Sequence, residues 1–138
     1  MKLKDFVIAE DIRFENGNKI SIMGVVDDEV TLTLPDDVEW PIPYRFGVFI
    51  RLNVEKTDLK PTKFTLTVVH DVNTIAKLDG SFEQKDTLGK IMLPLVINPF
   101  PLPGYGTIRF IIDIYNNENL LISESKELKV YPTKLEHN

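Results

Sequence analysis

The chain has 138 residues, no cysteine and a formal net charge of −5, with 43% hydrophobic and 27% charged residues. This composition suits one globular domain, and the lack of cysteine excludes a disulfide framework, a thiolate nucleophile and a Cys-ligated zinc site. The acidic balance and the scattered Lys and Arg residues argue against nucleic acid as a partner, because phosphate binding needs a positive surface.

The sequence also bears on location and domain organisation. No apolar run approaches the length of a transmembrane helix. The apolar run over residues 6–9 is too short for a signal peptide, and acidic residues lie on both sides of it. The absence of cysteine fits a reducing compartment. We therefore expect a cytoplasmic protein without a membrane span. Its single domain should cover residues 1–132 and be followed by a flexible tail over 133–138.

The first predicted element is a hairpin. Apolar residues alternate with others over residues 3–15 and 19–26, which is the period of a half-buried strand. A three-residue loop over 16–18 keeps apolar residues opposite one another and places Glu15 opposite Lys19. A two-residue Asn-Gly turn would mix the two faces, so we predict the three-residue loop.

The middle of the chain predicts a series of short strands separated by turns. They cover residues 30–34, 46–54, 64–68, 74–82 and 90–98. The strand over 46–54 has the cleanest alternation. Pro94 interrupts the last of these strands, and proline cannot donate to a ladder, so we expect that strand at a sheet edge or with a bulge. Proline-rich loops are predicted over 38–44 and 99–104.

A closing hairpin is predicted over residues 106–130, where Ile108, Phe110, Ile112 and Ile114 share one face. We expect it at the centre of the fold as the mate of strand 46–54. No segment shows helical period over a helix-like length. The pattern predicts an all-β fold, a single antiparallel β-sandwich of eight or nine strands. A C2-like sandwich and a flattened barrel are the alternatives.

Two stretches are similar to known families. Gly104, Gly106, Ile108 and Phe110 lead into the closing hairpin and resemble the penultimate strand of immunoglobulin-like and fibronectin-like sandwiches, which implies an immunoglobulin-like architecture. The corner tyrosine of those folds would fall at Ile108, and no cysteine pair is present. Residues 9–24 resemble the opening of an uncharacterised bacterial family, a domain of unknown function, which implies a sandwich and no particular activity.

His70 is the one candidate for acid–base catalysis outside the tail. It is predicted at a strand end beside Asp71, which could orient it as a catalytic base. Neighbouring residues of a strand point to opposite faces, however, so we expect a histidine at the rim of the core.

Acidic residues provide two further alternatives. The clusters at 27–29 and 36–37 could hold calcium with help from a loop such as that of Asp79, as in C2 domains, although solvated turns are the simpler interpretation. Because Asp and Glu are plentiful, a hydrolase that uses two carboxylates is the other alternative.

Aromatic and apolar residues that we expect outside the core form the candidate partner surface. They are Trp40, Tyr44, Phe49, Phe100, Tyr105, Ile111 and Tyr115. Several lie in the two proline-aromatic loops, which either plug the ends of the sandwich or form a platform for a carbohydrate or peptide. The loops can form one site only if strands 46–54 and 106–116 are not antiparallel neighbours.

The outward residues Phe49, Val69 and Ile111 would form a partner or homodimer interface if they share a patch, unless the loop at Trp40 covers them. These patterns favour a noncatalytic binding or assembly module without a metal or cofactor. Its partner would be another protein or a second copy. The alternatives are a calcium-dependent lipid- or glycan-binding domain and a hydrolase that uses Asp and Glu.

Overall fold

The computed structural model of the chain describes residues 1–17, 19–83 and 89–133. Within these residues the structure consists of β-strands and connecting turns, without helix. The strands are β1 (Lys2–Glu15), β2 (Lys19–Val26), β3 (Glu29–Leu32), β4 (Ile42–Val54), β5 (Lys63–His70), β6 (Asn73–Ser81), β7 (Gly89–Leu102), β8 (Gly106–Asn116) and β9 (Asn119–Pro132).

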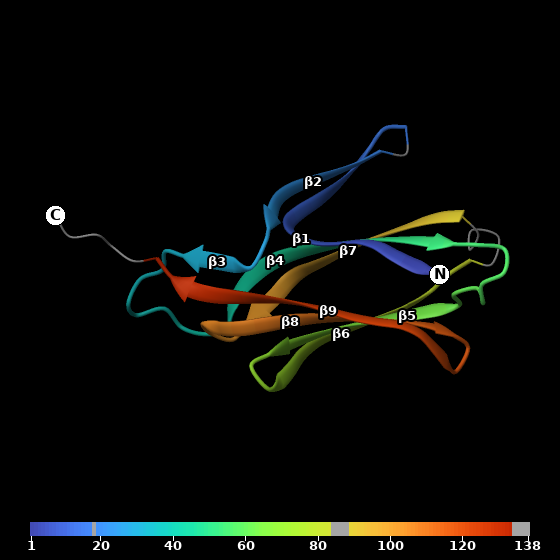
Figure 1. Cartoon of the computed structure of the whole chain (residues 1–138). Coiled ribbons are helices and arrows are strands. Elements are labelled where there is room, and N and C mark those ends of the chain that lie inside the picture. The colour runs from blue at the N-terminus through green and yellow to red at the C-terminus, as the bar shows by residue number, and fades with distance from the viewer. Residues whose placement is uncertain (18, 84–88, 134–138) are drawn as a thin grey trace.

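The strands form two sheets that pack face to face (Figure 1). Sheet A has the order β2-β1-β4-β7, and sheet B has the order β3-β9-β8-β5-β6. Each sheet keeps its own edge strands, so the fold is a sandwich and not a closed barrel. The prediction of an all-β sandwich is confirmed, and the flattened-barrel alternative is wrong.

One strand pair departs from the predicted antiparallel arrangement. β3 runs parallel to β9, with Glu29 opposite Lys129 and Leu32 opposite Pro132. The chain leaves β2 at the edge of sheet A and crosses to sheet B, where it meets β9 without a hairpin. The side-chain period of two is the same in parallel and antiparallel strands, so the alternation in the sequence could not reveal the direction.

The core lies between the two sheets and is built from the inward rows of β4, β5 and β8. Phe46 of β4 packs against Phe110 of β8, with ring centroids 5.3 Å apart, and against Phe100 of β7 at 5.1 Å. β8 of the closing hairpin and β4 therefore face one another across the core, as expected. They are not neighbouring strands of one sheet, because β8 pairs with β5 and β9.

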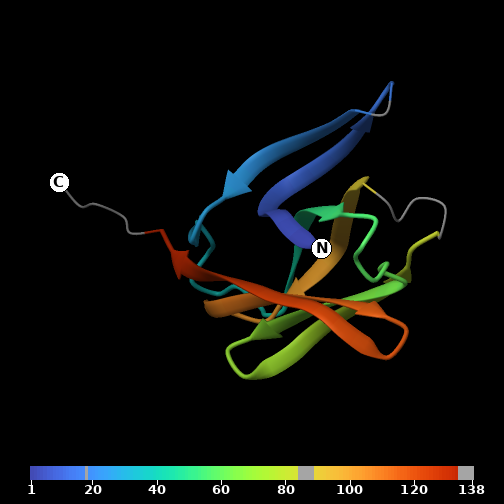
Figure 2. The ribbon, with the colours of Figure 1, turned by 45° about the vertical axis from the view of Figure 1, so that its right-hand side comes forward.

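The opening hairpin has the predicted register. Glu15 lies opposite Lys19 and Phe14 opposite Ile20, as the three-residue loop requires, and Gly17 of that loop has a φ of +77°. Asn18 lies outside the described residues. β1 pairs with β4 only as far as Ala9, after which the hairpin extends away from β4 and from sheet B (Figure 2).

β7 is an edge strand, as Pro94 predicted, and it pairs only with β4. It is longer than expected, because the segment predicted as a loop over 99–104 stays extended and pairs with β4 as far as Leu102. Prolines are tolerated at this edge because a sheet edge does not need every backbone donor. The predicted turn over 84–88 lies outside the described residues.

Candidate functional site

The two proline-aromatic segments meet at one end of the sandwich. They lead to and from strands of different sheets, since β4 belongs to sheet A and β8 to sheet B. The rings of Trp40 and Tyr105 pack edge to face, with centroids 5.0 Å apart and planes at 75°. The condition for a joint site of the two segments is therefore fulfilled, and Trp40 and Tyr105 lie together in it.

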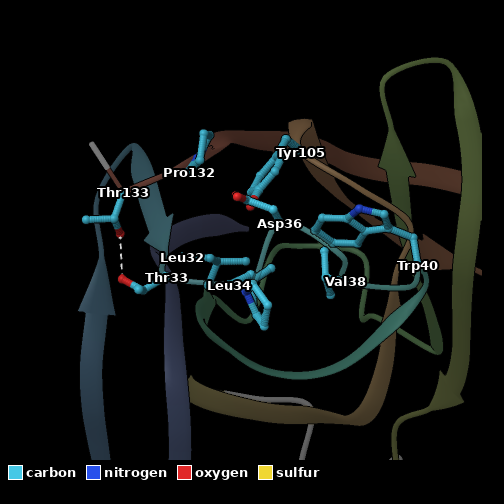
Figure 3. Close-up of a pocket in the computed structure, with 10 residues that line it drawn as sticks. Leu32, Thr33, Leu34, Asp36, Val38, Trp40, Tyr105, Pro132 and Thr133 are labelled. Atoms are coloured by element: carbon cyan, nitrogen blue, oxygen red, sulfur yellow. Dashed lines mark hydrogen bonds between the residues drawn. The ribbon is translucent and has the colours of Figure 1, made fainter. Parts of the chain in front are cut away.

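A pocket of about 310 Å³ opens beside this aromatic pair (Figure 3). Its other walls come from the end of β3, from the turn that follows β3, and from the end of β9. The lining residues are Leu32, Thr33, Leu34, Pro35, Asp36, Val38, Trp40, Tyr105, Pro132 and Thr133. The pocket thus combines apolar and aromatic surface with a few polar groups, which is the usual composition of a binding site.

Hydrogen bonds fix the wall formed by β3 and β9. The Thr133 N–H donates to the carbonyl of Leu32 at 2.9 Å, and the hydroxyls of Thr33 and Thr133 lie 3.0 Å apart. On the neighbouring turn, the Val38 N–H donates to the carbonyl of Pro35 at 3.2 Å. Because hydrogen bonds already hold these walls in place, few side chains and loops have to become ordered when a ligand binds, which favours affinity.

His70 fixes the segment that carries Tyr105. Its Nε2 lies 2.9 Å from the carbonyl oxygen of Tyr105 and 3.2 Å from that of Gly104, so Nε2–H donates to this segment. The side chain is buried at the end of β5, as expected for a histidine at the rim of the core. Its role is to hold the loop next to the pocket in place.

Asp71 does not point away from His70 as predicted. His70 Nδ1 and Asp71 Oδ2 are 3.8 Å apart, because Asp71 is the first residue of the turn after β5, with a φ of +53°. The Asp71 carboxylate accepts a hydrogen bond from the Thr107 N–H at 3.0 Å, and the Asp71 N–H donates to the Thr107 carbonyl at 2.8 Å. Both residues therefore connect the turn after β5 to the start of β8.

Among residues 1–17, 19–83 and 89–133, the pocket lining contains one carboxylate, that of the exposed Asp36. Carboxylate-based hydrolysis needs two such groups on either side of the scissile bond. One carboxylate beside two threonine hydroxyls and an aromatic pair can instead accept hydrogen bonds from a ligand and bind a positively charged group of that ligand. The arrangement is suited to recognition of a ligand that presents a donor beside an apolar group.

A second, apolar depression adjoins the site on the outer face of sheet A. It has a volume of about 270 Å³ and is formed where Pro41, just before β4, and Pro43 of β4 lie beside two prolines of β7. The lining residues are Pro41, Ile42, Pro43, Pro99 and Pro101. Pro41 follows Trp40 directly, so the aromatic pocket and the proline depression are continuous along the chain.

The remaining residues of the candidate partner surface are dispersed. Phe100 is fully buried and belongs to the core, opposite Tyr44 in the β4–β7 ladder. Tyr44 is half-buried and packs on Phe46, and burial, together with the charge of Glu10, raises the pKa of its hydroxyl.

Phe49 and Ile111 do not share a patch. Phe49 alternates with buried residues of β4 and points out of sheet A, whereas Ile111 alternates with buried residues of β8 and points out of sheet B. Tyr115 also belongs to the outer face of sheet B, where the ammonium of Lys63 lies 5.3 Å from its ring centroid. Val69, on the same sheet, is buried.

The walls of the pocket that come from residues 32–38 and from Pro132 and Thr133 were not predicted from the sequence. Acidic residues 36–37 predict a turn, but the position of this turn next to Trp40 follows from the parallel pairing of β3 with β9. No periodicity in the sequence reports that pairing.

No group of three His, Asp or Glu residues that could hold a metal ion occurs in residues 1–17, 19–83 and 89–133. The same part of the chain contains no helix that is long and apolar enough to cross a membrane.

No protein-family model matches the chain, and no curated protein is significantly similar to it. The resemblance of residues 9–24 to a bacterial family therefore stays a prediction.

Proposed function

We propose that the protein is a noncatalytic binding module that captures an extended segment of a protein partner in the pocket beside Trp40 and Tyr105. The observation that carries this proposal is the edge-to-face packing of Trp40 on Tyr105 beside a pocket of about 310 Å³, where two loops that each connect the two sheets come together. Rigid aromatic side chains supply contact area at a small cost in conformational entropy. The adjoining proline depression supports an extended ligand that continues past Trp40.

The charge of the site indicates what the segment should present. Asp36 is the carboxylate among the described lining residues, and the others are apolar, aromatic or hydroxyl-bearing. A segment with an apolar side chain next to Lys or Arg would fill the pocket and pair its charge with Asp36. Such a charge-assisted hydrogen bond is stronger than one between neutral groups.

Trp40 is the single tryptophan of the chain, so its fluorescence reports directly on the pocket. Peptides selected from a random library for binding to the protein should contain an apolar residue beside Lys or Arg and should change the Trp40 emission. Asp36→Asn should weaken binding of the selected peptides by about tenfold, the equivalent of about 1.4 kcal/mol.

Asp37→Asn is the matched control, because Asp37 is a neighbour that is also exposed and is not among the lining residues. This variant should bind the peptides as the wild type does. Peptides that leave the Trp40 emission unchanged, or that bind Asp36→Asn and the wild type equally, would overturn the proposed site.

The same assay separates this proposal from the two alternatives. A calcium-dependent lipid- or glycan-binding domain would show a higher melting temperature with calcium, and oligosaccharides would change the Trp40 emission. A hydrolase would release product from a panel of glycosides. We expect none of these responses, since the pocket has one carboxylate and the described residues contain no acidic group of three for a metal ion.

For the fold, we propose the immunoglobulin-like type. The order β9-β8-β5-β6 in sheet B corresponds to the G-F-C-C′ order of variable-type immunoglobulin sheets, and β1, β4 and β7 correspond to strands A, B and E. Ile108 stands where those domains have the corner tyrosine. The lack of cysteine in the sequence supports a reducing location such as the cytoplasm.

A further inference from the structure

The four edge strands of the described sheets differ in how they are protected against pairing with another chain. β3 has only four residues, β7 carries three prolines, and β6 carries the exposed charges of Lys77 and Asp79. Short length, proline and charge are the usual means by which an edge strand avoids pairing. β2 has eight residues and no proline, and its one charged residue, Lys19, is at its very start.

The unprotected edge lies on the part of the molecule that extends furthest from the sandwich. The tip of the β1–β2 hairpin extends away from β4 and from sheet B in two views, with β2 on its outer side (Figures 1 and 2). β2 also exposes apolar side chains, since Met23 is 45% exposed and Val25 is 65% exposed. A neighbouring chain could therefore approach β2 without contact with β4, β7 or sheet B.

The base of the hairpin is held in place. Ile12 packs over Gly47 of β4 so closely that a Cβ atom at Gly47 would lie 2.7 Å from Ile12 Cγ1. Asp11 forms ion pairs with Arg13 and with Arg45 of β4. These contacts fix the direction of the hairpin before any partner binds, which lowers the entropic cost of association.

We propose that β2 pairs antiparallel with β2 of a second copy about a twofold axis at Met23, an interface that is separate from the peptide pocket. This register places Lys19 opposite Asp27 of the other copy at both ends, so the charges are complementary. Between them, apolar or small residues face one another. The pairs are Ile20 with Val26, Ser21 with Val25, Ile22 with Gly24, and Met23 with Met23.

Two further observations agree with a continuous ladder through β2. The register of β2 with β1 is the same on either side of Gly24, although Gly24 has a φ of +67°. Residues with the same parity remain on the same face across the twofold axis, as an isologous interface requires. Two four-stranded sheets would thus join into one through the hairpins.

The chain has no cysteine, so single cysteines can test the register directly. Met23→Cys should form a disulfide-linked dimer under mild oxidation, because residues directly opposite one another have Cβ atoms about 4.5–5.5 Å apart. Val25→Cys should not, although Val25 is more exposed than Met23. In the proposed register the two Val25 residues are separated by four positions, or about 13 Å. Equal cross-linking at both positions would overturn the register.

Charge substitutions at the twofold axis test the interface without oxidation. The wild type should have the mass of a dimer in solution, and Met23→Lys and Met23→Glu should each be monomeric because like charges meet at the axis. A mixture of the two variants should form a dimer of one copy of each. Val72→Lys is the control, since Val72 is exposed on a distant turn, and it should remain dimeric.

A wild-type protein that is monomeric at millimolar concentration, or a mixture of the two variants that stays monomeric, would overturn the proposal. Neither result would bear on the peptide pocket, whose binding is read from the Trp40 emission. If the protein is monomeric and β2 instead binds a peptide of a different protein, the proposed pairing with a second copy is wrong.

Discussion

The opening hairpin, β1–β2, and the closing hairpin, β8–β9, have similar sequence patterns and different surroundings. In both, apolar residues alternate along two arms that an Asn-rich turn connects. Phe110 in β8 is 0% exposed, whereas Phe14 in β1 is 69% exposed. β8 faces sheet A across the core, but β1 leaves β4 after Ala9, so the ring of Phe14 is left largely exposed beside its β2 partner Ile20. Alternation thus predicts a strand, while the neighbouring layer decides whether its apolar face is buried.

The largest difference between the hairpins should appear when the two phenylalanines are truncated. Phe110→Ala removes a fully buried ring that packs on Phe46, and it should lower the free energy of unfolding by about 3–5 kcal/mol. Phe14→Ala should change it by less than about 0.5 kcal/mol, because the ring is largely exposed. Urea denaturation of both variants measures the two effects, and similar losses would contradict the comparison.

A smaller effect is expected at the joint where the opening hairpin leaves the sandwich. Gly47→Ala would place a Cβ atom 2.7 Å from Cγ1 of Ile12, so the base of the hairpin must shift. We expect a loss of about 1–3 kcal/mol in the free energy of unfolding, typical of overpacking.

A double-mutant cycle identifies the cause of that loss. If the contact with Ile12 is responsible, Gly47→Ala should cost much less in an Ile12→Ala background, so the two losses should not add. Additive losses would show that Gly47 is needed for another reason.

The smallest effect concerns the charge at the same joint. Hydrogen bonds from Arg13 and then Arg45 hold the pKa of Asp11 below its usual range, although burial opposes them. A lowered pKa in the folded state contributes stability above the unfolded value of about 3.9, and this stability is lost as the pH falls through the folded pKa. Asp11→Asn should therefore reduce the loss of stability below about pH 4. Equal slopes for variant and wild type would contradict this.

The sequence predicted what depends on local chemistry. The register of the opening hairpin followed from the apolar faces and the three-residue loop, and the edge position of β7 followed from Pro94. It could not predict which sheet each strand joins. That assignment decides whether the loops of Trp40 and Tyr105 meet, and it placed residues 32–38 in the wall of the pocket.

Two errors have local physical causes. His70 and Asp71 would point to opposite faces if the strand continued through both residues, but a positive φ at Asp71 ends the strand. The predicted loop over 99–104 remained in the ladder because prolines at an outer edge leave the β4 side of the strand free to pair.

The parallel pairing of β3 with β9 also governs the order in which the protein can fold. The hydroxyls of Thr33 and Thr133 beside this pair are 100 residues apart in sequence. Contacts between such distant residues require a large loop to close, which slows folding. During synthesis, β3 cannot pair until β9 has left the ribosome, so the wall of the pocket can form only after that point.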